Sequence, residues 1–207
     1  MLALGLAGMK PNRVVGVTGI TGSGTSTVSG ILAEHGGFVI SADKLAHEVM
    51  QAEARQEIVH HFSVNVLDET GKIDRKKLGG MVFGKPEKLN LLETIIHPHV
   101  IAKTLELLDN CQHSFAVIDA PLLVEAGMHK ICSEVWLVTA TDDVRLRRIV
   151  LRDGISQEAA LRRLHSRAGD SHLSQVANVV IENNAGPGEL QSIVKTALGL
   201  PNSLERI

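Results

Sequence analysis

With 207 residues and a formal net charge of −2, the chain is long enough for one compact domain with insertions. It is too nearly neutral for a general nucleic-acid or membrane-surface binder. One Trp, four Phe and no Tyr also argue against stacking platforms for single-stranded nucleic acid. Two cysteines, Cys111 and Cys132, allow at most one disulfide and suit a reducing compartment. We expect a cytoplasmic protein that binds neither nucleic acid nor membranes, as a monomer or a weak homo-oligomer.

The first residues are apolar but do not predict targeting. Residues 1–9 are too short to span a bilayer and carry no basic region before the apolar run. We expect residues 1–12 to be a poorly ordered extension, with Met9 as a second possible start.

A phosphate-binding loop is the most informative feature of the chain. The apolar run Val14–Thr18 predicts a buried strand, Gly19-x4-Gly24 follows it, and residues 26–35 predict a helix that ends at two glycines. Successive backbone N–H groups and the helix N-terminus form an anion-binding concavity in such a loop. The pattern ends in Gly-Lys-Ser, whereas this chain has Gly24-Thr25-Ser26, so the lysine that neutralises β/γ-phosphates is missing.

The rest of the chain alternates strands and helices, which predicts an α/β fold with a parallel sheet of about five strands. Helical segments are expected from about residue 44 to 62 and from 86 to 109, the second interrupted at His97-Pro98. Further strands are expected at 38–40, 115–118, 135–138 and 178–181.

Two carboxylates follow expected strands, at the sheet edge where open α/β sheets bind ligands. Asp43 follows the second strand, and Asp119 ends the third, where it could serve Mg²⁺ directly or through water. Each could instead cap the next helix or form a turn. The histidines, in contrast, lack metal-ligand spacing.

Residues 144–167 form a basic segment in which every cation is an arginine. Arg148 and Arg152 are four apart on one helical face, Asp153-Gly154 predicts a turn, and Ser156 is a plausible N-cap for a second helix. A solvated amphipathic hairpin and the arginine lid of a phosphotransferase both fit this segment. The presence of a phosphate-binding loop in the same chain favours the lid. The apolar face of the hairpin would consist of Leu146, Ile149, Val150, Leu161 and Leu164.

These features together resemble the bacterial dephospho-CoA kinases, over nearly the whole chain. The matching segments are 17–24, 39–47, 74–78, 97–99, 119–127 and 152–156. The resemblance implies transfer of the ATP γ-phosphoryl group to the ribose 3′-hydroxyl of dephospho-CoA, with Mg²⁺. It also implies a P-loop NTPase three-layer fold, with a core formed by 13–43, 111–142 and 177–207. A helical CoA-binding insertion would cover about 44–110, and an arginine-rich helical lid about 143–176, all within one kinase domain from 13 to 207.

The resemblance also assigns roles to single residues. Asp43 matches a carboxylate that orients or deprotonates the acceptor hydroxyl, and Arg148 and Arg152 match lid arginines that reach the phosphates. Ser26 matches the Mg²⁺-ligating hydroxyl, with Asp119 as a second candidate. The expected nucleotide-binding residues are Gly22, Ser23, Gly24, Thr25, Ser26, Thr27, Arg163 and Asn183.

The chain departs from the family pattern at Thr25, Ser41, Arg167 and Asn178. Thr25 leaves three hypotheses open: a slow enzyme, an enzyme in which Lys44 or Arg167 compensates, and a nucleotide- or CoA-binding regulatory relative without catalysis. A P-loop kinase for another small acceptor is a further alternative.

Overall fold

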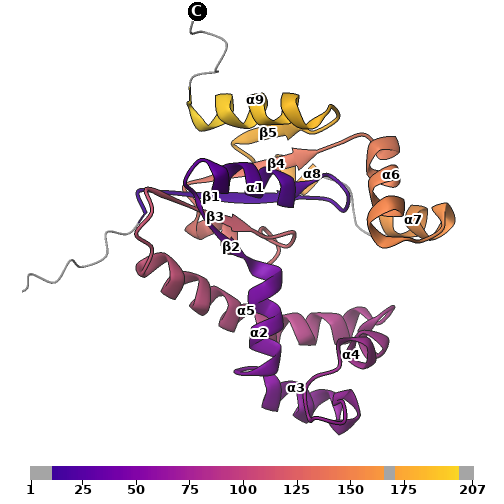
Figure 1. The fold of residues 1–207 in the computed structure, drawn as a ribbon. Coiled ribbons are helices and arrows are strands. Elements are labelled where there is room, and N and C mark those ends of the chain that lie inside the picture. The colour runs from indigo at the N-terminus through magenta and orange to yellow at the C-terminus, as the bar shows by residue number, and fades with distance from the viewer. Residues whose placement is uncertain (1–10, 166–170, 201–207) are drawn as a thin grey trace, which may run out of the picture. The chain divides into compact units, whose positions relative to one another are not determined.

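A computed structural model describes residues 11–165 and 171–200, in two compact units (Figure 1). The first unit comprises the described residues through Ile40 and from Cys111 onward, and the second is Ser41–Asn110. Of residues 1–12, which were expected to form a poorly ordered extension, residues 1–10 lie outside the described part. No helix in the described ranges has the length and apolar character needed to cross a membrane.

The first unit is built on a parallel sheet. Its helices and strands are β1 (Arg13–Gly19), α1 (Thr25–Glu34), β2 (Phe38–Ser41), β3 (Phe115–Asp119), η2 (Met128–Ile131), β4 (Glu134–Thr139), α6 (Asp142–Asp153), α7 (Gln157–Leu164), α8 (Ser171–Ser174), β5 (Val179–Glu182) and α9 (Pro187–Leu198). All five expected strands form, each within two residues of its expected bounds.

The strand order is β2-β3-β1-β4-β5, which puts β1 at the centre of the sheet. Val17 of β1 pairs with Asp119 of β3 on one side and with Trp136 of β4 on the other. The chain leaves β1 for β2 and β3 on one side, and β4 and β5 extend the sheet on the other. The loop after β1 therefore opens at the topological switch point, where doubly wound sheets bind their ligands.

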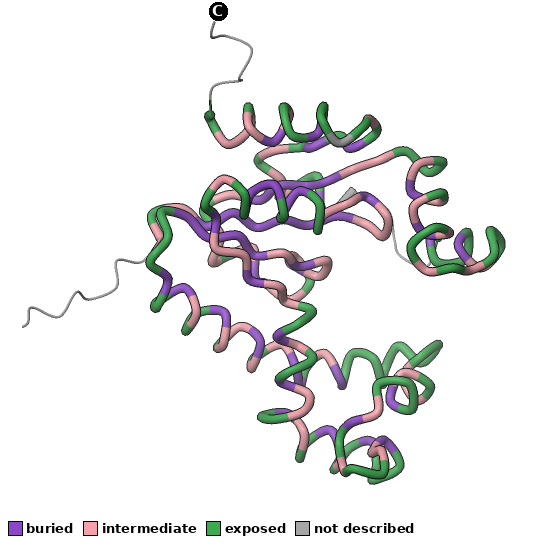
Figure 2. Tube along the Cα trace, viewed as in Figure 1, coloured by how far each residue is buried: buried purple, intermediate pink, exposed green. Residues whose placement is uncertain are grey.

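The core fills both faces of the central strands, as a parallel sheet requires. Val15 and Val17 of β1 and Trp136 of β4 pack with α1 and α9 on one face. Strands β1 and β4 form the buried centre of the first unit in Figure 2. On the other face, an added Cβ at Gly16 would lie 2.6 Å from the side chain of Leu123, so the segment after β3 packs directly on β1.

The helix α1 ends as the sequence predicts. Gly36 takes a φ of 89°, and the N–H groups of Gly36 and Gly37 donate to the carbonyls of Ala33 and Leu32. This Schellman pattern closes the C-terminus of α1 and releases the chain into β2.

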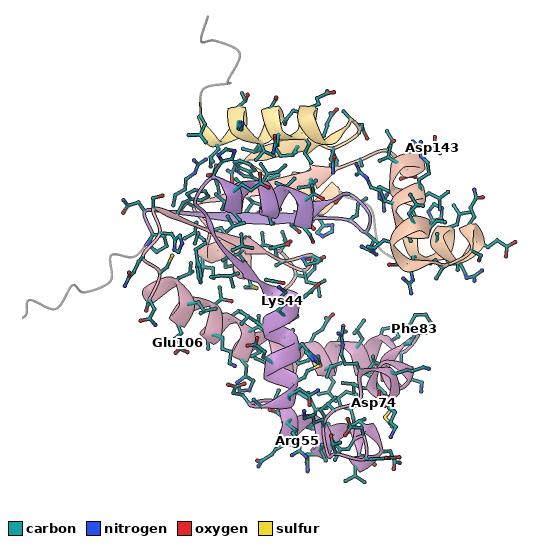
Figure 3. The ribbon with its side chains drawn as sticks, in the orientation of Figure 1. Lys44, Arg55, Asp74, Phe83, Glu106 and Asp143 are labelled. Atoms are coloured by element: carbon teal, nitrogen blue, oxygen red, sulfur yellow. The ribbon has the colours of Figure 1, made fainter. Side chains whose placement is uncertain are left out.

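The second unit is helical. It contains α2 (Ala42–Gln51), α3 (Arg55–Phe62), η1 (Val64–Val66), α4 (Arg75–Val82) and α5 (Pro86–Asp109). The side chain of Gln51 exchanges two 2.9 Å hydrogen bonds with the backbone of Ile73, and Arg55 (labelled in Figure 3) donates to the carbonyl of Gly71. These contacts tie the segment between η1 and α4 to α2 and α3.

Two features of this unit differ from the sequence analysis. The helix α5 continues through His97-Pro98 without interruption. Pro98 removes only the N–H that would bond to the carbonyl of Thr94, while the buried residues Ile95 and Val100 on either side keep the helix packed. The helix α4 was not predicted, although Asp74 caps it by accepting from the N–H groups of the second and third residues.

Candidate active site

The loop between β1 and α1 has the backbone shape of an anion cradle. Gly22 and Gly24 have φ values of 85° and 98°, a left-handed conformation that disfavours other residues. Ser23 closes a turn by donating its N–H to the carbonyl of Ile20 at 3.0 Å. The N–H of Thr27 donates to the Gly24 carbonyl at 3.0 Å, whereas the N–H groups of Thr25 and Ser26, the first two residues of α1, have no carbonyl acceptor within the helix and no side-chain cap. They remain available to an anion at the positive end of the helix dipole.

Arg148 and Asn183 hold the outer side of this loop. Nη1 of Arg148 donates to the carbonyls of Gly22 and Ser23, at 3.4 and 3.1 Å. Nδ2 of Asn183 donates to the same Ser23 carbonyl at 2.8 Å, and its Oδ1 accepts from Nη2 of Arg148 at 3.1 Å. Asn183 is 4% exposed, and an added Cβ at Gly24 would lie 2.3 Å from its Nδ2. Helix α6 and the residue after β5 therefore support the loop together.

The charge of Arg148 persists beside the loop. Burial lowers the pKa of its guanidinium, and the neighbouring charge of Arg147 lowers it further. Because the pKa of an arginine starts far above neutrality, Arg148 stays protonated at physiological pH. The Arg148 cation therefore contacts the backbone of a loop that carries Thr25 in place of lysine.

Sequence reasoning missed Arg145, which it counted in the basic segment without a role. Arg145 is 4% exposed, and its Nε donates to the carbonyl of Thr21 at 2.9 Å. Arg145 and Arg148 are three residues apart, so they share one helical face toward the loop. The three-residue spacing between Arg145 and Arg148 was the feature of the sequence that could have identified Arg145 as a neighbour of the loop.

The expected helical hairpin forms, with its turn at Gly154 (φ 61°) and the Ser156 hydroxyl accepting from the N–H of Ala159 at the start of α7, while its role as a lid stays a prediction. One member of the expected apolar face is wrong, because Leu161 is 38% exposed. Ala160 is buried in its stead, with Ile155 packed against the cluster.

The hydrogen bonds described for Arg152 and Arg163 join them to Asp153. Arg152 donates to both carboxylate oxygens of Asp153, at 2.8 and 3.2 Å, and Arg163 donates to the same group. These hydrogen bonds, led by the one from Arg152, hold the pKa of Asp153 below its ordinary value. Both side chains are more than half exposed, so the α6–α7 hairpin presents two cations gathered around one carboxylate.

The two metal candidates come from neighbouring elements. Ser26 lies in the first turn of α1, and Asp119 ends β3 opposite Val17, two residues before the end of β1. No three His, Cys, Asp or Glu side chains gather as a metal site in the described ranges. Mg²⁺ bound through phosphates needs only one or two protein oxygens, so these residues fit that mode of binding.

Asp43 and Lys44 belong to the second unit. They are exposed residues in the first turn of α2, which begins directly after β2, and Lys44 is labelled in Figure 3. The catalytic role of Asp43 and the compensating role of Lys44 stay predictions. Arg167, the other expected compensating cation, lies outside the described residues.

Two of the residues that depart from the family pattern, Ser41 and Asn178, accept hydrogen bonds from the backbone. The Ser41 hydroxyl accepts from the N–H of Lys44 and caps α2. Oδ1 of Asn178 accepts from the N–H of Val135 at 2.7 Å, where β4 and β5 begin.

Comparison with known proteins gives a consistent result. A family model described as dephospho-CoA kinase matches residues 13–189. A dephospho-CoA kinase of Dehalococcoides mccartyi is 39% identical over 187 residues, covering 88% of this chain and 94% of the relative. A dephospho-CoA kinase of Fusobacterium nucleatum is 40% identical over 178 residues, with 86% and 92% covered.

Solved structures agree with the sequence matches. TT1252 from Thermus thermophilus has a TM-score of 0.79 at 31% identity, covering 92% of this chain and 98% of its own. Dephospho-CoA kinase from Campylobacter jejuni has a TM-score of 0.58 at 30% identity, with 90% and 96% covered. A shikimate kinase from Acinetobacter baumannii, at 16% identity and a TM-score of 0.51, shares the fold.

Proposed function

The chain belongs to the dephospho-CoA kinase family, and we propose that it transfers the γ-phosphoryl group of ATP to the ribose 3′-hydroxyl of dephospho-CoA. The observation that carries the proposal is the loop after β1, whose outer carbonyls are held by Arg148 and Asn183. Holding the carbonyls on the outer side turns peptide N–H groups toward the bound phosphates. This is the arrangement that phosphoryl transfer needs, since positioning and charge stabilisation supply most of its catalysis.

On the donor side, residues 22–27 would bind the phosphates through backbone N–H groups and hydroxyls. Arg148 would approach the nucleotide from its place on the loop, and Asn183 would lie near the base. Arg152 and Arg163 would exchange the carboxylate of Asp153 for phosphate oxygens. Guanidinium groups suit this exchange because their planar forks bind carboxylate and phosphate in the same bidentate way.

On the acceptor side, Asp43 would accept the proton of the ribose 3′-hydroxyl. The 3′-oxygen forms a bond to the γ-phosphorus while the bond from that phosphorus to the β–γ bridging oxygen breaks. ADP leaves with the bonding electron pair, and the proton rests on Asp43 until it passes to water. The second unit would supply the site for dephospho-CoA as a helical insertion.

Mg²⁺ is proposed to arrive with ATP and to be held by the Ser26 hydroxyl, with Asp119 acting directly or through water. The ion would neutralise charge that develops on the phosphate oxygens. Thr25 supplies a hydroxyl but no charge at the position of the missing lysine, and its Cγ2 would lie 3.2 Å from a Cβ added at Gly19. The cationic neighbours of the loop therefore matter more here than in a loop with lysine.

The test is purified protein with ATP, Mg²⁺ and dephospho-CoA, followed for CoA and ADP by liquid chromatography. We expect the two products in equal amounts. Absence of CoA despite binding of both substrates would reject the proposal in favour of the second candidate, a regulatory binding protein, which Thr25 favours. Phosphorylation of another small acceptor in preference to dephospho-CoA would also reject it. A cytoplasmic protein, monomeric or weakly self-associating, is the form in which we expect this activity.

A further inference from the structure

One arginine of α6 is buried while its neighbours are not. Arg145 is 4% exposed, whereas Arg147 and Arg152 on the same helix are exposed to solvent. A guanidinium is almost never fully buried unless its donors are paired, because its desolvation is costly. The partners of Arg145 therefore indicate what the buried charge does.

Those partners come from three separate segments. Nε donates to the Thr21 carbonyl in the loop at 2.9 Å, and Nη1 to the Asp142 carboxylate in the first turn of α6 at 2.8 Å. Nη2 donates to the Leu164 carbonyl in the last turn of α7 at 3.5 Å. The last carbonyls of a helix lack partners within it and form the negative end of its dipole. One guanidinium thus joins the loop to both lid helices.

The backbone at Arg145 also lies against the loop. A Cβ added at Gly22 would be 3.0 Å from the Arg145 carbonyl oxygen and 3.2 Å from its Cα. The carbonyl and the N–H of a trans peptide point in opposite directions. By binding the Thr21 carbonyl on the outside, Arg145 directs the N–H of Gly22 to the opposite side of the same peptide.

We infer that Arg145 is a positioning residue for nucleotide binding, and the inference rests on the proposed function. It fixes the Thr21–Gly22 peptide so that the Gly22 N–H faces the phosphates, and it fastens the end of α7 to the loop. Three of the five N–H donors of Arg145 are used by protein and its side chain is buried, so we assign it to positioning the loop rather than to contact with the substrate. Arg148 supports the next two carbonyls and is also expected to reach the nucleotide, so the two arginines have different duties.

The test compares Arg145→Met with Arg147→Met. Methionine keeps most of the stem of arginine and removes every donor. Arg147 is a matched control because it is the same residue type on the same helix, is exposed, and, among the residues that the structure describes, donates to the backbone of Asp143. We expect Arg145→Met to raise the KM for ATP about 10–100-fold, as misplacement of a binding group by about 1 Å would do. The KM for dephospho-CoA should change less than about three-fold, and Arg147→Met should leave both values near wild type.

Arg145→Lys separates geometry from charge. A lysine keeps the positive charge but lacks the planar fork that joins three segments. The KM for ATP should therefore remain at least about five-fold above wild type in Arg145→Lys. A wild-type KM in this variant would overturn the inference, because charge without the fork would then suffice.

Thermal unfolding of each variant distinguishes positioning from general instability. The assays are run at least about 15 °C below each Tm, where the unfolded fraction is negligible. A lowered Tm with a wild-type KM for ATP, or equal increases in KM for both substrates, would overturn the inference. If Arg145→Met does not fold, Arg145→Lys carries the same comparison.

Nucleotide binding gives a readout without turnover. Calorimetry with MgADP should show that Arg145→Met loses affinity by about the same factor as its KM for ATP rises, while Arg147→Met does not. This result supports the inference even if the wild-type protein makes no CoA, in which case only the proposed function fails. Equal MgADP affinity in the two variants would overturn the inference.

Discussion

Replacing Asn183 with leucine removes the support of the phosphate-binding loop while nearly keeping the volume of the side chain. The change deletes the 2.8 Å bond to the Ser23 carbonyl and the 3.1 Å bond from Arg148. A neutral hydrogen bond contributes roughly 0.5–1.5 kcal/mol and one to a charged group roughly 1.5–3 kcal/mol. We therefore expect a loss of about 2–4 kcal/mol of unfolding free energy.

For a chain of this length, each kcal/mol lowers Tm by roughly 2–4 °C, so the Tm of Asn183→Leu should fall by roughly 4–16 °C. The KM for ATP should rise about ten-fold or more, because the Gly24 N–H follows the orientation of the Ser23 carbonyl. Circular dichroism melting and steady-state kinetics measure the two effects.

Asn184→Leu is the matched control. Asn184 is exposed, and its side chain accepts one hydrogen bond, from the N–H of Thr141 at 2.8 Å. Its loss should cost about 1 kcal/mol, or roughly 2–4 °C, and should leave the KM for ATP unchanged. If Asn183→Leu and Asn184→Leu melt together and share the wild-type KM, Asn183 does not support the loop.

Thr25→Lys should raise kcat/KM for ATP about ten-fold or more in steady-state assays, because it adds a cation at the β/γ-oxygens; a flat or lower rate would mean that another cation already serves them. Asp43→Asn should abolish nearly all CoA formation while MgADP affinity, measured by calorimetry, stays within a few-fold; unchanged turnover would remove Asp43 from the mechanism. Arg152→Ala should lower kcat roughly 10²–10³-fold and weaken ATP binding far less, whereas a loss of affinity alone would make the residue a clamp. Burial raises the pKa of the Cys132 thiol to about 12, so iodoacetamide at pH 8 should label it at least about 100-fold more slowly than free cysteine, as followed by mass spectrometry; labelling at the free rate would contradict that burial.

The strands and the loop were predictable because their signals are local. Apolar runs bounded by glycines and carboxylates specified all five strands, and the spacing of Gly19 and Gly24 specified the loop. The Gly154 turn and the Ser156 cap were predictable for the same reason.

The errors arose where tertiary contacts override local preference. Pro98 predicts a break, yet α5 continues because residues on both sides of it are buried. Leu161 fits the helical period of the lid and still faces solvent, whereas Ala160 is buried. Arg145 could not be assigned because burial of a charge depends on partners far away in the sequence, such as the Thr21 carbonyl.

The distance along the chain between the loop and its supports has a consequence during synthesis. Ser23 and Asn183 are 160 residues apart in sequence, and Ser23 and Arg148 are 125 apart. At about 5–20 residues per second, a ribosome needs roughly 8–30 s to make Asn183 after Ser23. Throughout that interval the nascent chain carries the glycine loop without Asn183, and for most of it also without Arg148. We therefore expect ATP to stabilise the completed chain rather than the emerging one, and a truncated chain that ends before α6 should gain no thermal stability from nucleotide.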